Sequence, residues 1–111
     1  MNQLVLVGRL VKDVEVEKLE DGRRVANITL AIQRPFKNQE GVYECDFINC
    51  IAFDHISDSI KSYCEKGDLI AVKGRLQSRP YKIDETRTEH RIEVIAERIS
   101  FLSKKKSVEE N

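Results

Sequence analysis

Residues 46–77, DFINCIAFDHISDSIKSYCEKGDLIAVKGRLQ, contain the succession of elements that decides the fold. The stretch begins with a run rich in Phe, Ile and Cys, Asp46 to Phe53, which is typical of a β-strand. Apolar residues then recur at helical spacing with polar residues between them: Ile56, Ile60, Tyr63 and Cys64. Asp54 suits the N-cap of this helix and Gly67 its C-terminal stop. Leu69 to Gln77 has strand character again, so the stretch predicts a strand, a short helix and a strand.

Two more strands are expected before this stretch and one after it. Asn2 to Leu10 is rich in Val and Leu, and Val25 to Gln33 alternates apolar with polar residues. His90 to Leu102 provides the last apolar run. Five strands with a single helix between the third and the fourth is the order of the OB-fold. We therefore predict an all-β protein, a five-stranded OB-fold barrel with one short helix between strands 3 and 4.

Glycine and proline predict where the strands stop. Asp21-Gly22 is suited to a tight hairpin turn before the second strand. Pro35 is expected to end that strand, because proline cannot donate to a β-ladder. Residues 80–88, which begin with Pro80, are expected to form a polar loop before the last strand.

The length of 111 residues suits one domain with a single core. We expect the OB-fold domain to cover residues 1–102, and residues 103–111 to form a short, charged, disordered tail. No apolar run approaches the roughly 20 residues of a membrane-spanning helix, and the first residues do not read as a targeting signal. We therefore expect a cytoplasmic protein with no membrane contact.

Cysteine and histidine usage argues against metal binding and catalysis. Cys45, Cys50 and Cys64 are an odd number without a CxxC pair, so we expect reduced core residues. A zinc site made from these three and His55 is the alternative, although zinc sites usually show closely paired ligands. His90 is the one other histidine, and the motifs GxSxG, HExxH and GxxxxGK[ST] are all absent from the sequence. We expect no metal, no cofactor and no enzymatic activity.

The charges balance overall but segregate along the chain. The sequence has 19 basic and 19 acidic residues, and the resulting net charge of zero by itself argues against a nucleic-acid partner. However, residues 22–39 and 73–82 contain several cations and no acid, whereas residues 40–68 are rich in acids. The acid-free runs favour contact with phosphates, and an ordinary solvated face is the alternative.

Side chains of the fourth strand alternate between two faces. One face is expected to lie in the core: Ile70, Val72, Gly74 and Leu76. If the extended geometry continues past this set, the other face carries a row of cations that ends in a ring: Lys73, Arg75, Gln77, Arg79 and Tyr81. That row is suited to lie along a sugar-phosphate backbone.

Both faces of the third strand are apolar, and the pattern alone leaves open which one is the core. One face carries Phe47, Asn49, Ile51 and Phe53, and the other carries Ile48, Cys50 and Ala52. Only one face of a small barrel can be core, so the other must meet a ligand, a partner subunit or a loop. Phe36 has the parity of the buried row of the second strand, but the preceding Pro35 makes its orientation uncertain.

The sequence resembles the bacterial single-stranded DNA-binding proteins from residue 2 to about residue 102, and five segments carry the resemblance. They are NQLVLVGRL at 2–10, VANITLA at 25–31, DFINC at 46–50, YCEKG at 63–67 and VKGRLQSR at 72–79. The resemblance implies an OB-fold, a homotetramer whose first strands pair between subunits, and DNA wrapped over aromatic platforms. Carried over residue by residue, the stacking positions fall on Phe36, Phe47, Phe53 and Tyr81.

Cations and apolar residues complete the expected site. The residues expected to contact the DNA backbone are Arg34, Lys37, Lys73, Arg75, Arg79 and Lys82. The residues expected at the subunit interface form the apolar strand near the start of the chain: Leu4, Val5, Leu6 and Val7.

The sequence departs from the family pattern at its stacking positions, where Pro35 and Pro80 each precede a predicted ring, and at its C-terminal end. It has no tryptophan, which family members often have at stacking positions, so its platforms are smaller. The general replication protein of the family ends in a long tail with an acidic, Phe-tipped end, whereas this sequence stops at Glu109-Glu110-Asn111. We therefore expect a short form without the acidic C-terminal tail and with weak or no recruitment of tail-binding enzymes; a longer chain cut at the tail would look the same.

The expected function is to bind and protect single-stranded DNA, without strong sequence specificity, in replication, recombination, repair or DNA uptake. The alternative is a primosome-type OB-fold subunit that mainly holds a partner replication enzyme. A strongly basic surface with few stacking rings would favour that alternative. OB domains that bind tRNA or oligosaccharides are more distant alternatives.

Overall fold

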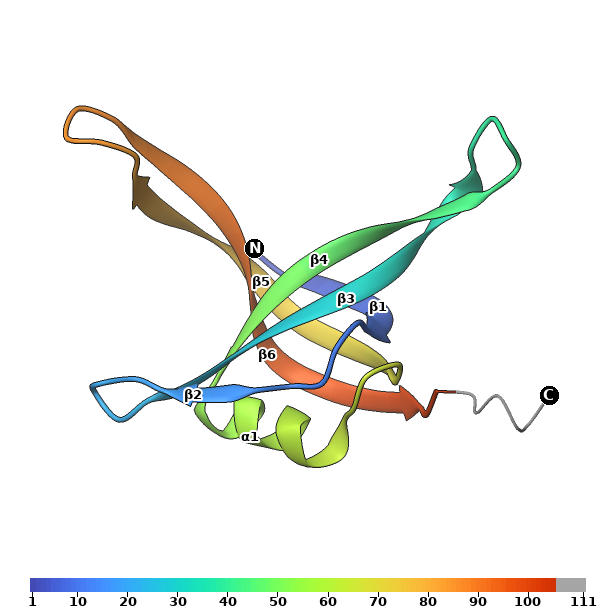
Figure 1. Cartoon of the computed structure of the whole chain (residues 1–111), viewed down its shortest axis with the longest axis horizontal. Helices are drawn as coiled ribbons and strands as arrows, with labels where there is room; N and C mark the ends of the chain where they lie inside the picture. The colour runs from blue at the N-terminus through green and yellow to red at the C-terminus, as the bar shows by residue number, and fades with distance from the viewer. Residues whose placement is uncertain (106–111) are drawn as a thin grey trace.

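Six β-strands and one helix form the fold in the computed structural model, which describes residues 1–105 (Figure 1). The elements are β1 Leu4–Leu10, β2 Val16–Lys18, β3 Arg24–Lys37, β4 Tyr43–Phe53, α1 Asp54–Tyr63, β5 Leu69–Lys82 and β6 Thr88–Ser103. The sheet order is β1-β5-β6-β4-β3-β2, and pairing of β1 with β3 closes the sheet into a barrel. Only the β4–β6 pair is parallel among these strands of residues 1–105. The predicted OB-fold is confirmed, with β2 as a short strand beside the start of β3.

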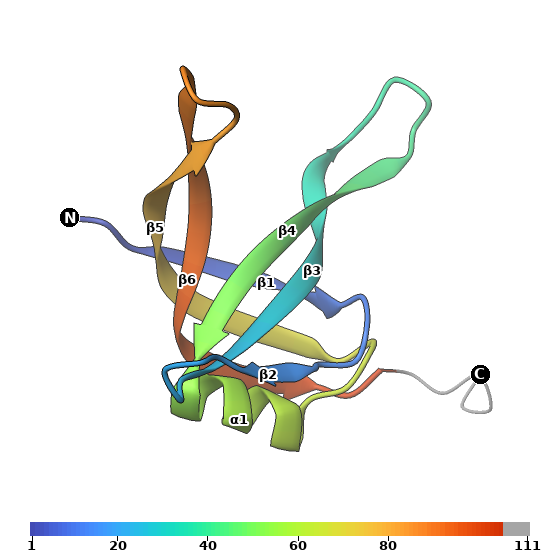
Figure 2. The same cartoon turned by 60° about the vertical axis from the view of Figure 1, so that its left-hand side comes forward.

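The core lies inside the barrel and resolves the ambiguity of β4. Cys50 and Ala52 are fully buried, and Ile48 packs against the core, so this face of β4 points inward. The opposite face, which carries Phe47, points outward. Below the barrel, α1 covers its end and buries Ile60 completely (Figure 2).

The start of α1 differs from the predicted cap. Phe53 occupies the N-cap position without a side-chain cap, and Asp54 is the first helical residue, with a φ of 52°. The Asp54 carboxylate instead accepts a hydrogen bond from the backbone N–H of Arg24 at 3.1 Å. Asp54 therefore joins the helix to β3 and does not cap the helix.

Two hairpins extend beyond the barrel as arms, one formed by β3 and β4 and the other by β5 and β6 (Figures 1 and 2). The predicted strand end at Pro35 and the predicted start of a loop at Pro80 are wrong, because β3 continues to Lys37 and β5 to Lys82. Within residues 1–105 each distal arm strand pairs only with the other strand of its arm, so the missing N–H of a proline can face the open edge. The arms are therefore longer than the sequence pattern predicted.

The end of β6 is tied to the bottom of the barrel. This strand runs to Ser103, one residue past the expected domain boundary, and the Lys105 N–H donates to Oδ1 of the buried Asp68 at 3.2 Å. Residues 106–111, which include most of the expected tail and its acidic end, lie outside the described residues. Within residues 1–105 no helix is long and apolar enough to cross a membrane.

The three cysteines occupy different environments. Cys45 is exposed, whereas Cys50 and Cys64 are buried, and all three are free thiols. Burial raises the pKa of Cys50 to about 11, and burial together with the nearby Asp68 carboxylate raises the pKa of Cys64. In the part of the chain that the structure describes, no three His, Cys, Asp or Glu side chains are grouped so as to hold a metal ion.

A thiol reagent should therefore distinguish Cys45 from the other two cysteines. At about pH 8 the native protein should react rapidly at this residue alone, because the thiolate is the reactive form and the raised pKa values keep the buried thiols protonated. Release of the coloured product from DTNB measures the rate. Cys45→Ser should abolish the rapid phase, and denaturant should expose the two remaining thiols. Rapid reaction of more than one thiol per native chain would contradict the burial.

Candidate nucleic-acid interface

A groove lies on the outer face of the barrel between the two arms, which diverge on the same side of the molecule (Figure 2). It has a volume of about 450 Å³, and four strands and the loop after β1 contribute to it. Its lining residues are Lys12, Asn27, Thr29, Asn49, Ile51, Arg79, Tyr81, Arg91, Ile92 and Glu93. The fold thus brings together side chains from both halves of the sequence.

The floor of the groove is polar because it is built from the outward-facing residues of β3 and β4. Asn27 lies opposite Ile51, and Thr29 lies opposite Asn49. The Thr29 hydroxyl donates to Oδ1 of Asn49 at 2.5 Å, which orients the amide and leaves its nitrogen to donate to a ligand. The floor can therefore hydrogen-bond the edge of a base.

One wall of the groove combines a ring with positive charge. The Cζ atom of Arg91 lies 3.5 Å from the centroid of the Tyr81 ring, within cation–π range. Arg79 lies directly opposite Arg91 in the β5–β6 pairing, and its Nε is 3.5 Å from Oε2 of Glu93. The wall can therefore stack a base and attract a phosphate.

Two of the four predicted stacking rings are open to solvent. Phe36 and Phe47, both on the arm formed by β3 and β4, are 78% and 67% exposed. Phe47 shares the outward face of β4 with Asn49, so its ring continues the groove toward the tip of this arm.

The other two rings are each covered by an arginine. Tyr81, which lines the groove, has Arg91 over its ring. Phe53 is half-buried at the end of β4, and the Cζ atom of Arg23 lies 4.3 Å from its ring centroid. Of the four predicted rings, the structure brings only Tyr81 into the groove itself.

The acid-free runs of the sequence are not acid-free in space. Arg75 lies 3.6 Å from Glu97, and Arg79 is paired with Glu93, in each case through an acid on the neighbouring strand β6. Three predicted contact residues form no ion pair with a carboxylate of residues 1–105: Lys37, Lys73 and Lys82. The free cationic charge is therefore smaller than the sequence pattern indicated.

Arg34 is the most strongly paired of the predicted contact residues. Its guanidinium lies 2.7 Å from Asp46 and 2.8 Å from Glu44. The hydrogen bond from Arg34 holds the pKa of Asp46 below its ordinary value and raises that of the guanidinium. Because the Asp46 pKa is depressed in the folded chain, the pair stabilises the arm at neutral pH and loses this effect as the pH falls through that depressed value.

Freeing Arg34 should strengthen DNA binding if this arm contacts phosphates. The double substitution Glu44→Gln and Asp46→Asn removes two negative charges beside the guanidinium, so we expect roughly several-fold tighter binding of oligo-dT at low salt and a steeper salt dependence. Anisotropy titration measures both quantities. Glu17→Gln, a charge change on β2, serves as the matched control. Affinity unchanged from the wild type would argue that DNA does not contact this arm near Arg34.

The predicted row of cations along β5 does not lie on one common surface. The extended geometry does continue to Tyr81, but Lys73 lies opposite Val5 of β1, away from the groove that Arg79 and Tyr81 line. The placement of Leu76 in the core is wrong, because the residue is 45% exposed at the base of the arm, where the barrel interior ends.

The predicted interface strand β1 presents two different faces. Leu4 and Leu6 pack against the core, whereas Val5 and Val7 are exposed. Along residues 4–8 this strand pairs with β5 on one edge only, within the described residues. The outward valines and the open edge are the parts of β1 that another subunit can reach.

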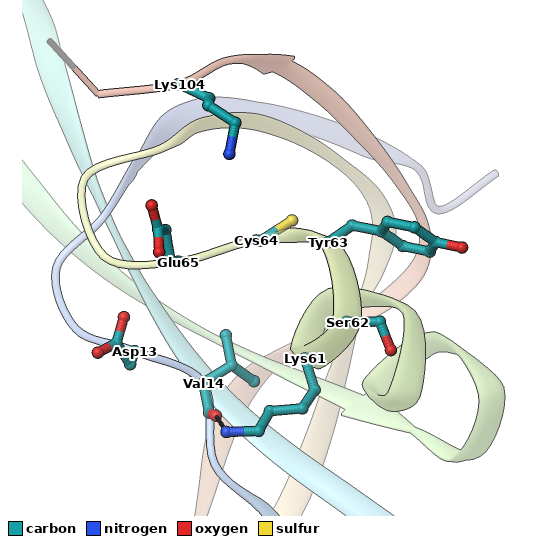
Figure 3. A pocket seen from close by; sticks show the side chains of 8 residues that line it. All are labelled: Asp13, Val14, Lys61, Ser62, Tyr63, Cys64, Glu65 and Lys104. Atoms are coloured by element: carbon teal, nitrogen blue, oxygen red, sulfur yellow. Dashed lines mark hydrogen bonds between the residues drawn. The ribbon is translucent and has the colours of Figure 1, made fainter.

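A second pocket, of about 340 Å³, lies beside the end of α1 (Figure 3). Asp13 and Glu65 balance Lys61 and Lys104 in its lining, and the ring of Tyr63 points away from the other labelled side chains. Lys61 Nζ donates to the carbonyl of Val14 at 2.9 Å, which joins the helix to the loop after β1. This pocket offers neither a stacking ring nor an excess of charge.

Arg91 is the main site residue that the sequence pattern missed. It belongs to a strand that was identified by its apolar residues, and its place opposite Arg79 depends on the register of β5 with β6. If the turn of the hairpin is placed between Lys82 and Thr88, the antiparallel register puts Arg79 opposite Arg91.

Comparison with known proteins supplies the family context. Residues 1–102 match the Single-strand binding protein family. The chain is 45% identical over 102 residues to the single-stranded DNA-binding protein of Halalkalibacterium halodurans, covering 92% of this chain and 61% of the relative. It is 45% identical over 105 residues to single-stranded DNA-binding protein 1 of Staphylococcus aureus (95% and 63%), and 39% identical over 104 residues to single-stranded DNA-binding protein B of Bacillus subtilis (94% and 92%). The chain thus spans less than two thirds of the first two relatives and most of the third.

Proposed function

The chain belongs to the Single-strand binding protein family, and on this premise we propose that it binds and protects single-stranded DNA without catalysing a reaction. Replication, recombination, repair and DNA uptake all expose single strands and are the processes that such binding serves. The free cysteines support a cytoplasmic location, which stays a prediction.

One observation carries the proposal: exposed rings and a polar groove follow one another along the outward face between the arms. The Phe47 ring stands at one end, Asn49 and Thr29 form the floor, and Tyr81 stands on the wall. Bases stack on such rings with little dependence on identity, because every base has a π-face. The Phe36 ring on the same arm is also open to solvent.

The experiment that tests the proposal is an anisotropy titration of labelled oligo-dT, oligo-dA and duplex DNA between about 50 and 200 mM salt. We expect both single strands to bind more tightly than the duplex, and their affinity to fall as salt rises, because bound cations displace condensed counterions. Duplex binding as tight as oligo-dT binding, or affinity insensitive to salt, would contradict the proposal.

The alternative of a partner-holding subunit has less support from the molecule. The balanced charge and the two open rings on one arm favour stacking of bases over a predominantly basic docking surface. The same titration separates the two functions, since a subunit that mainly holds an enzyme need not prefer single strands.

We also propose that the protein is a homotetramer in which β1 strands of two subunits pair. The open edge of β1 and its outward valines support this arrangement, because an unpaired edge strand is a template for another strand. An isologous contact of this kind suits a two-fold axis.

Val5→Asp should therefore lower the mass measured by multi-angle light scattering from a tetramer toward smaller species, since it would place a carboxylate in the contact. Val42→Asp, the same substitution at an exposed valine in the loop between β3 and β4, should leave the tetramer intact. A monomeric wild-type protein at micromolar concentration, or a tetrameric Val5→Asp variant, would contradict pairing through β1.

A further inference from the structure

We propose that Arg79 and Arg91 form a phosphate-binding site beside Tyr81, and that Arg91 is a further DNA-contacting residue. The proposal rests on the proposed function and names the group that the groove wall would hold. That group is one phosphodiester of the strand whose base stacks on Tyr81.

The first support is a pair of like charges that is only partly compensated. Arg79 and Arg91 lie directly opposite each other on antiparallel strands, and like charges in that position are destabilising. Glu93 offsets the charge of Arg79, but among residues 1–105 no carboxylate pairs with Arg91. Glu89, which lies opposite Tyr81, pairs with a different arginine: its Oε1 atom is 3.8 Å from Nη2 of Arg87. An anion between the two arginines would remove the repulsion.

The second support is the net charge of this cluster. Two arginines and one carboxylate give a charge of +1, which matches the single negative charge of one phosphodiester. The Glu93 carboxylate forms an ion pair with Arg79, so Arg91 supplies the positive charge that remains to bind an anion.

The third support is the contact of Arg91 with the ring. With its Cζ atom 3.5 Å from the Tyr81 centroid, the guanidinium covers one face of the ring, and Tyr81 is still 43% exposed. A guanidinium on a ring keeps its edge N–H groups free, and their fork geometry suits two oxygens of a phosphate. Ring and cation therefore form one platform that binds adjoining parts of a nucleotide.

The test compares Arg91→Ala, Arg91→Lys and a control, Lys18→Ala, which removes an exposed cation from β2 outside the groove. Each protein is titrated with labelled oligo-dT between about 50 and 200 mM salt. We expect Arg91→Ala to bind about tenfold more weakly at low salt, with the slope of log affinity against log salt reduced by about one. Arg91→Lys should keep the slope but bind less tightly than the wild type, because it loses the planar fork. Lys18→Ala should change neither quantity.

A double variant tests whether Arg91 and Tyr81 act as one platform. If they do, the fold-loss of affinity in the double variant Tyr81→Ala and Arg91→Ala should be smaller than the product of the fold-losses in the two single variants. Arg91 is exposed, so thermal melting of its variants should match the wild type.

Each outcome separates this proposal from the function on which it rests. Wild-type affinity and slope in Arg91→Ala would overturn the phosphate site while leaving DNA binding in place. An equal loss at every salt concentration would overturn it too, because Arg91 would then only support the ring. Failure of the wild-type protein to bind oligo-dT would instead overturn the proposed function.

Discussion

Phe47→Ala should weaken the binding of single-stranded DNA by about 1–3 kcal/mol, roughly 5- to 150-fold, and leave thermal melting nearly unchanged. The ring is 67% exposed on the outward face of β4, so its loss removes a stacking platform and little packing. The affinity should fall about equally at every salt concentration, because stacking releases few counterions. Anisotropy titration and a thermal melt on the same preparation measure both effects.

Tyr63→Ala is the matched control for this substitution. Its ring is also exposed, but it lies at the end of α1, outside the groove. We expect wild-type DNA affinity for this control. The interpretation of Phe47 as core, which the sequence left open, would instead give a loss of about 3–5 kcal/mol in stability. Such a loss, with unchanged affinity in the folded fraction, would remove Phe47 from the proposed site.

Ile28→Ala should lower the free energy of unfolding by about 2–5 kcal/mol, because it leaves a cavity in the barrel interior. Ile28 is 1% exposed and lies opposite the buried Cys50. Denaturant unfolding at a fixed protein concentration measures the change, since subunit association also contributes to stability.

Ile92→Ala is the matched control, the same substitution at a residue that is 66% exposed in the groove. It should change the free energy of unfolding by no more than about 0.5 kcal/mol. Equal losses for Ile28→Ala and Ile92→Ala would contradict the division of the sheet into an inner and an outer face.

Alternation of side chains predicted much of this division from the sequence. The inward face of β3, with Ala26, Ile28 and Leu30, follows directly from a period of two. In β4 the same period gave two apolar faces, and only closure of the barrel makes Cys50 and Ala52 the inner one. The alternation pattern therefore predicts where the strands lie in the sequence better than it predicts which of their two faces points into the core.

The prolines show where a local rule fails. Pro35 was expected to end a strand, since it lacks a donor, and Pro80 was expected to begin a polar loop. In the fold, both lie on arms where one edge of the strand has no partner within residues 1–105, so no ladder hydrogen bond is lost on that edge. Whether a strand edge is open depends on the strand order of the whole sheet, and the residues around a proline do not determine that order.

Charge was the least predictable part of the candidate site. The run from Lys73 to Lys82 has no acid, yet Glu93 and Glu97 on β6 neutralise two of its arginines. The same strand adds Arg91, which no pattern in the sequence singled out. Electrostatics between strands depends on register, and register is fixed by the whole sheet.

Photocrosslinking tests most directly whether single-stranded DNA lies between the arms. Oligo-dT carrying 5-iododeoxyuridine is irradiated in complex with the full chain, and the crosslinked residues are identified by mass spectrometry. We expect adducts at Tyr81 and Phe47, whose rings stand at the wall and the end of the groove surface. Adducts confined to Tyr63, beside α1, would contradict this account and place the DNA on another face of the barrel.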